Sequence, residues 1–298
     1  MWEFEGLFDA VIDPEDASML AEFWRDEQSG IKIGKMGYRR RTTKAGPRLE
    51  AEVFPMFGRG DMSKARAAKK NITPEAQQKV NIERSARRLI QLVEANFTEE
   101  DVSLALTYEG DPPDDDRVRK DIRNFLNKVK RMRERKGLPE LKYIYAIGGD
   151  EMPSRGYSGK RPHVHMIVNG GIDRDELEAL WKPHGTANCD RLQPSEEGLE
   201  RLARYLMKQR LDRPEKKNAK KWSRSRNLKE PWKKTSDCKI SNAKVKRIAF
   251  DFQNYAKETM EKLYPGYTFI KCKVSFSDVI DGVYIRCIMR KTPGRGKK

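Results

Sequence analysis

The chain has 298 residues, a length that suits two domains or one domain with extensions. Its net charge of +17 attracts polyanions, so nucleic acid is the first candidate partner and an anionic membrane surface the second. No apolar run approaches the roughly 18–20 residues of a membrane-spanning helix, and the start of the chain lacks a basic-then-apolar signal. We therefore expect a soluble, intracellular protein without a membrane partner. The four cysteines are scattered, which indicates reduced thiols.

The first part of the chain has few clear signals. Residues 1–70 are interpreted as an N-terminal extension with a short helix from Asp13 to Trp24. From Tyr38 to Lys70 a basic stretch interrupted by Gly and Pro predicts a linker and an arm that faces DNA. Thr73 as N-cap and Pro74 at the first helical position predict a helix that ends near Asn96.

The next elements alternate between strands and helices, by their apolar periodicity. The expected elements are a strand at 102–108, a helix at 114–136, strands at 141–147 and 163–168, a helix at 173–181, a strand near 187–192 and a helix at 195–209. This order predicts an α+β fold of the ferredoxin/RRM-like plan, with a central antiparallel sheet and helices on one face. We assign residues 71–235 to this domain. Residues 236–298 are expected to form a C-terminal extension with one helix, 239–263, and a β-hairpin.

Two of the three histidines, His163 and His165, lie two residues apart on the expected central strand. Because side chains on a strand alternate between faces, both imidazoles point the same way, and such a pair suits a metal ion. On this motif alone, two surface histidines on an amphipathic strand remain an equal alternative. A zinc site that combines Cys189 with His184 is a further alternative.

Tyr205 lies away from the apolar side of its expected helix. The residues of that apolar side are Leu199, Leu202, Ala203 and Leu206. Arg201 and Lys208, one turn before and after Tyr205, lie beside it. Nearby cations favour the phenolate form of a tyrosine, which a nucleophile needs. A half-exposed tyrosine on a basic surface is the alternative.

Together these segments resemble a known family, the HUH endonucleases, and within it the rolling-circle replication initiators (Rep proteins) of bacterial plasmids and phages. The resemblance rests on three segments in the family's order: LALTY at 104–108, RPHVHMIVNGG at 161–171 and RLARYLMKQ at 201–209. It covers roughly residues 75–235. A glycine stands where the family usually has an acidic metal ligand, so Glu151 is the expected third ligand, with Asp150 second.

The resemblance implies an enzyme, a DNA endonuclease and strand transferase. His163 and His165 would bind Mg²⁺ or Mn²⁺, which polarises the scissile phosphate. Tyr205 would attack that phosphate to give a 5′-phosphotyrosine and a free 3′-OH, and Lys208 would support the charged transition state. The substrate would be single-stranded or hairpin origin DNA in the bacterial cytoplasm, nicked to start rolling-circle replication and later rejoined.

A basic stretch with interleaved aromatics, 216–234, predicts DNA binding, because cations hold phosphates and indoles stack on unpaired bases. A solvated basic loop is the alternative. The expected DNA-binding residues are Arg201, Lys221, Trp222, Arg224, Arg226 and Lys229. The chain has no G-x-x-x-x-G-K-[ST] motif, so we expect no ATP site and a separate helicase as partner.

Two other functions remain open. The same chemistry serves conjugative relaxases and transposases, and the motifs do not separate these from replication initiators. A non-catalytic module that binds RNA or single-stranded DNA is the alternative from another class. Such a module would carry exposed aromatics on its central strands, where this chain carries histidines.

Overall fold

The computed structural model describes residues 37–56, 74–111, 113–149, 161–211, 222–276 and 283–293. The chain forms two compact units. Unit 1 contains Met1–Arg87 and Pro231–Lys298, and unit 2 contains Arg88–Glu230, so the division falls inside helix α3 (Pro74–Asn96). The described residues of each unit build one five-stranded antiparallel sheet. The predicted class, α+β with an antiparallel sheet, is confirmed. Within the described residues, no helix has the length and apolar character needed to cross a membrane.

Unit 2 has the order of elements expected from the sequence. In chain order they are β3 (Val102–Thr107), α4 (Asp115–Arg135), β4 (Tyr143–Gly148), β5 (His163–Val168), α5 (Arg174–Trp181), β6 (Ala187–Arg191), α6 (Glu200–Leu211) and β7 (Ser223–Arg224). The strands lie in the order β6-β3-β5-β4-β7. The strand with the two histidines, β5, is therefore the central one.

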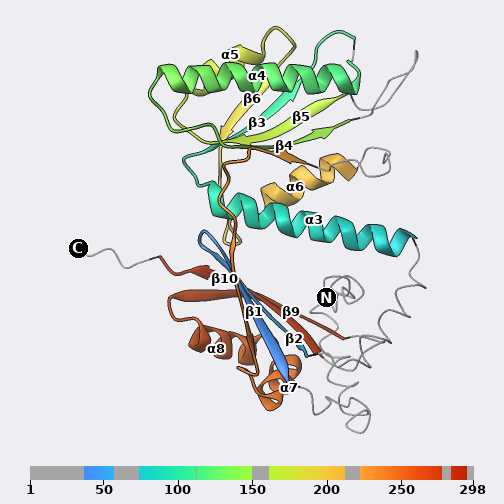
Figure 1. The fold of residues 1–298 in the computed structure, drawn as a ribbon, viewed down its shortest axis with the longest axis vertical. Helices are drawn as coiled ribbons and strands as arrows, with labels where there is room; N and C mark the ends of the chain where they lie inside the picture. The colour runs from blue at the N-terminus through green and yellow to red at the C-terminus, as the bar shows by residue number, and fades with distance from the viewer. Residues whose placement is uncertain are drawn as a thin grey trace. The chain divides into compact units, whose positions relative to one another are not determined.

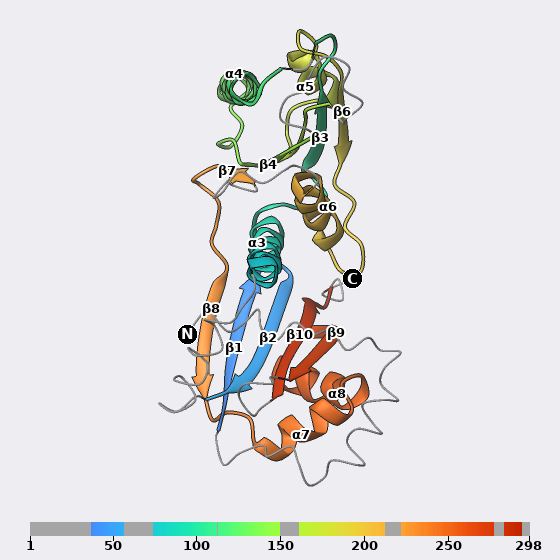
Figure 2. The same ribbon diagram turned by 90° about the vertical axis from the view of Figure 1, so that its right-hand side faces the viewer.

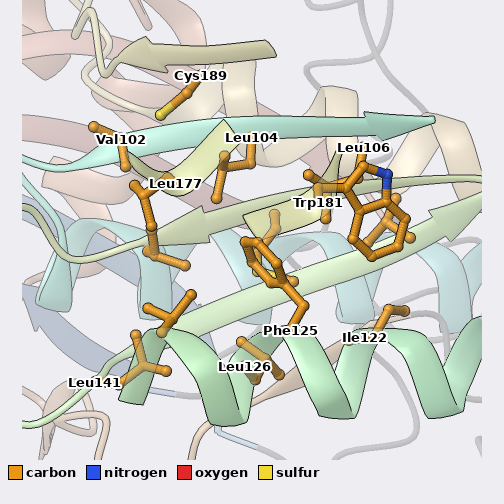
Figure 3. Close-up of a cluster of buried hydrophobic side chains, with 14 of the residues drawn as sticks. Val102, Leu104, Leu106, Ile122, Phe125, Leu126, Leu141, Leu177, Trp181 and Cys189 are labelled. Carbon is orange, nitrogen blue, oxygen red and sulfur yellow. The ribbon is translucent and has the colours of Figure 1, made fainter. Parts of the chain in front are cut away.

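Helices α4 and α5 cover one face of this sheet (Figure 1). Side chains at alternate positions of the strands pack against the apolar side of α4 and against α5, as Figure 3 shows for Leu104, Phe125 and Trp181. The indole nitrogen of Trp181 donates to the carbonyl oxygen of Thr107 at 2.8 Å, so its one polar atom is satisfied inside the core. Asp114 caps α4 by accepting from the backbone N–H of Arg117.

The opposite face of the same sheet is covered by α6, which packs against β4 (Figure 1). The expectation of helices on one face is therefore wrong, because α6 has its own buried residues: Leu199 at its start, Ala203, Leu206 and Met207. The helix also begins at Glu200 and not at Ser195. Ser195 and Gly198 exchange two backbone hydrogen bonds, of 2.9 and 2.8 Å, and Gly198 has a φ of 76°, which closes a turn before the helix.

Unit 1 brings together segments from both ends of the sequence. Its elements are β1 (Tyr38–Ala45), β2 (Arg48–Pro55), β8 (Trp232–Asp237), α7 (Asn242–Phe250), α8 (Asn254–Leu263), β9 (Tyr267–Phe276) and β10 (Val283–Lys291). The strands lie in the order β8-β1-β2-β10-β9, and α7 and α8 cover one face of the sheet (Figure 2). Where the sequence predicts a linker and an arm after Tyr38, the structure thus has a β-hairpin through Pro55. The expected helix at Asp13–Trp24 and the remainder of the arm after Met56 lie outside the described residues.

The single helix expected at 239–263 is two helices. Ser241 caps α7 by accepting from the backbone N–H of Lys244. At Asp251 the side chain accepts from the N–H of Asn254 and the backbone carbonyl accepts from Ala256. An aspartate that binds nearby backbone groups in this way ends one helix and starts the next.

The other face of the unit 1 sheet carries a buried cluster of arginines and glutamates, here called the Arg–Glu cluster. Its members are Arg41, Arg48, Glu50, Glu52, Arg87 and Arg286. Glu50 accepts from Arg48 at 2.8 Å and from Arg87 at 2.9 Å. Burial alone would raise the pKa of Glu50, but the surrounding guanidinium groups outweigh it and hold that pKa well below its usual value. For Glu52 the same balance gives a pKa of about 2.

Candidate active site

The two histidines of β5 lie on the face of the sheet that α6 partly covers. Val164 and Met166 point into the core under α4, so His163 and His165, which alternate with them, point to the other face. Their ring centroids are 5.1 Å apart. The structure therefore brings the two imidazoles together on one rigid central strand.

His163 is held in one orientation by its neighbours. Its Nδ1 lies 2.9 Å from the carbonyl oxygen of Arg161, which can only accept, so Nδ1 carries the proton and Nε2 carries the lone pair. Gly148, the cross-strand partner of His163, lies under the ring. A Cβ added to Gly148 would stand 2.4 Å from Nε2, so the imidazole occupies the space that any other side chain would fill. This explains in physical terms why a glycine stands at this point of β4.

Tyr205 reaches His165 from α6. The phenolic oxygen lies 3.5 Å from Nε2 of His165, and the two rings meet edge to face with centroids 4.9 Å apart. This distance is longer than a normal hydrogen bond, so we treat it as a contact that places the phenol at the imidazole. Tyr205 is 46% exposed, in agreement with its predicted position away from the apolar side of the helix. The contact joins residues that are 40 positions apart in the sequence.

The environment of His165 favours the neutral imidazole. Burial, and secondly the neighbouring His163, lower the pKa of His165 to about 4. At neutral pH the ring therefore offers a lone pair, which is the form that binds a metal ion.

Lys208 and Arg201 lie beside Tyr205 on α6, three residues after it and four before it, and both are exposed. Residues at these spacings share one side of a helix. Arg204, the immediate neighbour of Tyr205, is instead bound to Glu200 at 2.9 Å. The basic side of α6 near the phenol thus comes from Lys208 and Arg201.

The donors present fit a divalent cation in part. Two neutral imidazoles on one strand are suitable ligands, and a carboxylate would complete a set for Mg²⁺ or Mn²⁺. The predicted third ligand, Glu151, and its alternative Asp150 lie outside the described residues. Within the described part of the chain, no three His, Cys, Asp or Glu side chains form a group that could hold a metal. His184 lies elsewhere, with its Nδ1 3.6 Å from Asp121, and no zinc site with Cys189 is found among these residues.

The predicted DNA-binding residues of the stretch after α6 lie at the edge of the unit 2 sheet. β7 pairs with β4, and Arg224 is opposite Ile144, on the same face as the histidines. Arg224 is also bound to Glu230 at 2.9 Å, so its charge is partly compensated. Arg226 and Lys229 are exposed, and Trp222 is half-buried. Lys221 lies outside the described residues.

Two features of this site were missed by the sequence analysis. The contact of His163 with Gly148 depends on the register of two strands, and the orienting carbonyl of Arg161 is a backbone group with no sequence signature. The glycine at Gly148 was noticed as a departure, but its role in making room for the imidazole requires the paired strands.

A comparison with protein families gives one match. The family model of the ORF2-type Replication-associated protein matches residues 101–210. This is a family of rolling-circle replication initiators. The matched segment runs from just before β3 into α6 and therefore contains His163, His165 and Tyr205. The comparisons with curated proteins and with solved structures give no match. The family recognised in the sequence is confirmed over these residues, and with it a replication-associated role.

Proposed function

We propose, from the premise that residues 101–210 belong to a family of rolling-circle replication initiators, that this chain nicks and rejoins origin DNA. The reaction would be metal-dependent and would use Tyr205 as nucleophile. The DNA substrate would be single-stranded or an extruded hairpin. The order of elements in unit 2, β-α-β-β-α-β followed by α6, is the ferredoxin-like plan and supports the HUH type.

One observation carries the proposal: the phenolic oxygen of Tyr205 lies 3.5 Å from Nε2 of His165. A nucleophile and a ligand group from separate elements meet at one point of the molecule. Tyr205 is also 46% exposed, so a phosphodiester can reach its oxygen from solvent. A tyrosine that served only packing would have no reason to lie off the buried side of α6 and against an imidazole.

The chemistry balances without any further reactant. The phenolic oxygen forms a bond to the scissile phosphorus as the bond from phosphorus to the 3′-oxygen breaks. The phenol loses its proton, and the departing 3′-oxygen takes one up. The products are a 5′-phosphotyrosine and a free 3′-OH, which can attack the phosphotyrosine in the reverse sense and restore the strand without ATP.

The residues around Tyr205 would each have a part in this step. His163 and His165 would hold a divalent cation, which when bound supplies Lewis-acid polarisation of the phosphate. Arg161 keeps the lone pair of His163 on Nε2 through its carbonyl. Lys208, one turn after Tyr205, would stabilise negative charge on the attacking oxygen and on the phosphate. Arg201, on the same side of the helix, would bind the DNA backbone.

The test is a covalent adduct assay. The protein is incubated with Mn²⁺ and a labelled hairpin oligonucleotide from a candidate origin, and the products are run on a denaturing gel. We expect a labelled protein band with the native chain and none with Tyr205→Phe, which keeps the ring and its contact with His165. An adduct that persists in Tyr205→Phe would refute the nucleophile.

The same assay separates the alternatives. A relaxase or transposase would form the adduct on a transfer-origin or element-end oligonucleotide and not on a replication origin. A non-catalytic module would bind single strands tightly and form no adduct with any DNA.

A further inference from the structure

The edge of the unit 1 sheet that carries β1 and β8 presents aromatic rings and cations side by side. Lys44 and Trp232 are cross-strand partners, so their side chains point to the same face. The ammonium of Lys44 lies 5.6 Å from the centre of the Trp232 ring and 5.7 Å from the centre of the Tyr267 ring. A lysine is thus held between two aromatic rings from separate strands.

The same face continues along β1 with a second pair. Arg40 lies 5.4 Å from the centre of the Tyr264 ring, and the hydroxyl of Tyr264 is 2.6 Å from that of Thr42. Lys234, opposite Thr42 on β8, points to this face as well. We call this set, Arg40, Lys44, Trp232, Lys234, Tyr264 and Tyr267, the aromatic–cation patch.

This patch is open to solvent where the neighbouring part of the face is closed. Further along the face, Leu49 and Ala51 of β2 are fully buried in the core under α7 and α8. Trp232 is 51% exposed, and Lys44 and Lys234 are also exposed. A large indole is seldom left half in solvent on a sheet face without a partner that covers it.

Its chemistry differs from that of the Arg–Glu cluster on the opposite face. There the carboxylates of Glu50 and Glu52 neutralise the guanidinium groups. The aromatic–cation patch combines three cations with rings and contains no carboxylate. Such a surface complements a polyanion that also offers flat rings.

We propose that the aromatic–cation patch of unit 1 is a second nucleic-acid site, which binds single-stranded DNA by stacking an unpaired base on Trp232. Lys44 and Lys234 hold the adjacent phosphates, and Tyr267 keeps Lys44 in place. Unpaired bases stack on aromatic side chains, whereas the bases of a duplex are already stacked and closed to an indole. DNA is the occupant because the family match of unit 2 is to replication initiators.

The test measures the affinity of the full-length protein for a fluorescein-labelled oligo(dT) by anisotropy, in EDTA so that no nicking can occur. Trp232→Ala is expected to weaken binding by about 5- to 100-fold, the range for loss of one stacked base. Trp232→Phe, which keeps a ring, restores most of the affinity. Lys44→Gln reduces the slope of log affinity against log salt concentration by about 0.7, the amount for one phosphate on a single strand.

Phe250→Ala is the matched control, because Phe250 is another exposed aromatic of unit 1, at 64%, and lies outside the patch. It should leave oligo(dT) binding unchanged. The proposal is overturned if Trp232→Ala binds oligo(dT) as Phe250→Ala does. It is also overturned if Trp232→Ala weakens binding to a duplex or to oligo(U) and not to oligo(dT).

The outcome is separate from that of the nicking assay. Loss of oligo(dT) affinity in Trp232→Ala would stand even if Tyr205 formed no adduct. Conversely, an adduct at Tyr205 with unchanged oligo(dT) binding in Trp232→Ala would sink the patch and leave the nicking proposal intact.

Discussion

The two sheets have the same number of described strands and each packs one face against a pair of helices, yet their second faces differ in chemistry. In unit 1 the second face holds the Arg–Glu cluster, where Glu50 binds Arg48 and Arg87 at 2.8 and 2.9 Å. In unit 2 it holds two imidazoles and a phenol, and the closest approach of Tyr205 to His165 is 3.5 Å. One face has its charges neutralised by short contacts, and the other has reactive groups in loose contact.

This difference separates stability from chemistry. Buried charges that are paired hold strands in register, and removing one partner leaves the other uncompensated. Imidazoles and a half-exposed phenol contribute little to the folding of unit 2 and are available to a phosphate. We therefore expect changes on the unit 1 face to lower the free energy of unfolding, and changes on the unit 2 face to lower nicking at nearly constant stability.

The largest effect is expected from the histidines. His163→Ala and His165→Ala should each reduce the nicking rate by at least about 100-fold, because even changes that merely misorient a ligand cost 10- to 100-fold. Binding of oligo(dT) should stay within a factor of about two. The measurement is single-turnover cleavage with Mn²⁺. The third histidine provides the control: His184→Ala, beside Asp121 and away from Tyr205, should keep nicking. Equal loss in all three variants would contradict the ligand role.

In the Arg–Glu cluster, Glu50→Gln is expected to lower the free energy of unfolding by about 3–5 kcal/mol, because it leaves buried guanidinium groups without their carboxylate. Urea denaturation followed by circular dichroism measures this. Glu258→Gln, which removes an exposed carboxylate bound to Lys262, should cause no measurable change. A result in which both variants are as stable as the native chain would mean that the cluster does not support the unit 1 sheet.

Gly148→Ala tests the fit of the imidazole over β4. The added methyl would stand 2.4 Å from Nε2 of His163, so the ring must move, and we expect a loss of nicking of about 10- to 100-fold. Gly266→Ala should show the opposite pattern. Gly266 has a φ of 81° with no atom within 4 Å of an added Cβ, so this variant should lose stability and keep nicking. Full nicking in Gly148→Ala would show that His163 does not need its present position.

The smallest effect is a dependence of stability on pH. The pKa of Glu52 is about 2 in the folded chain against an ordinary value of 4.5. Below about pH 4.5 the unfolded chain therefore binds a proton that the folded chain does not, and stability falls as the pH falls from about 5 towards 2. Thermal melts across this range should show a decline that is shallower in Glu52→Gln. A parallel decline in both proteins would assign acid sensitivity to other groups.

The sequence was sufficient to predict the local part of the candidate site. His163 and His165 could be placed on one face from the alternation of a single strand, and Tyr205 could be placed off the buried side of α6 from helical spacing. Both depend on residues close together in the chain. The order of strands and helices in unit 2 follows from the same local patterns.

What the sequence could not predict depends on contacts between distant segments. Arg41 suggests a DNA-facing arm when read alone, whereas in the sheet it pairs with Glu52 and their charges cancel. β8 joins β1 across nearly two hundred positions, so unit 1 could not be recognised as one sheet, and Trp232 could not be matched with Lys44. The break between α7 and α8 is local but depends on how the side chain of Asp251 is used.

The most direct test of the central claim is to identify the residue that carries DNA after nicking. The adduct formed with Mn²⁺ and an origin oligonucleotide is digested with protease and nuclease, and the modified peptide is sequenced by mass spectrometry. The account predicts a nucleotide linked through its 5′-phosphate to Tyr205, in the peptide that contains the α6 residues next to His165. A nucleotide on any other residue, or a link through a 3′-phosphate, would contradict it.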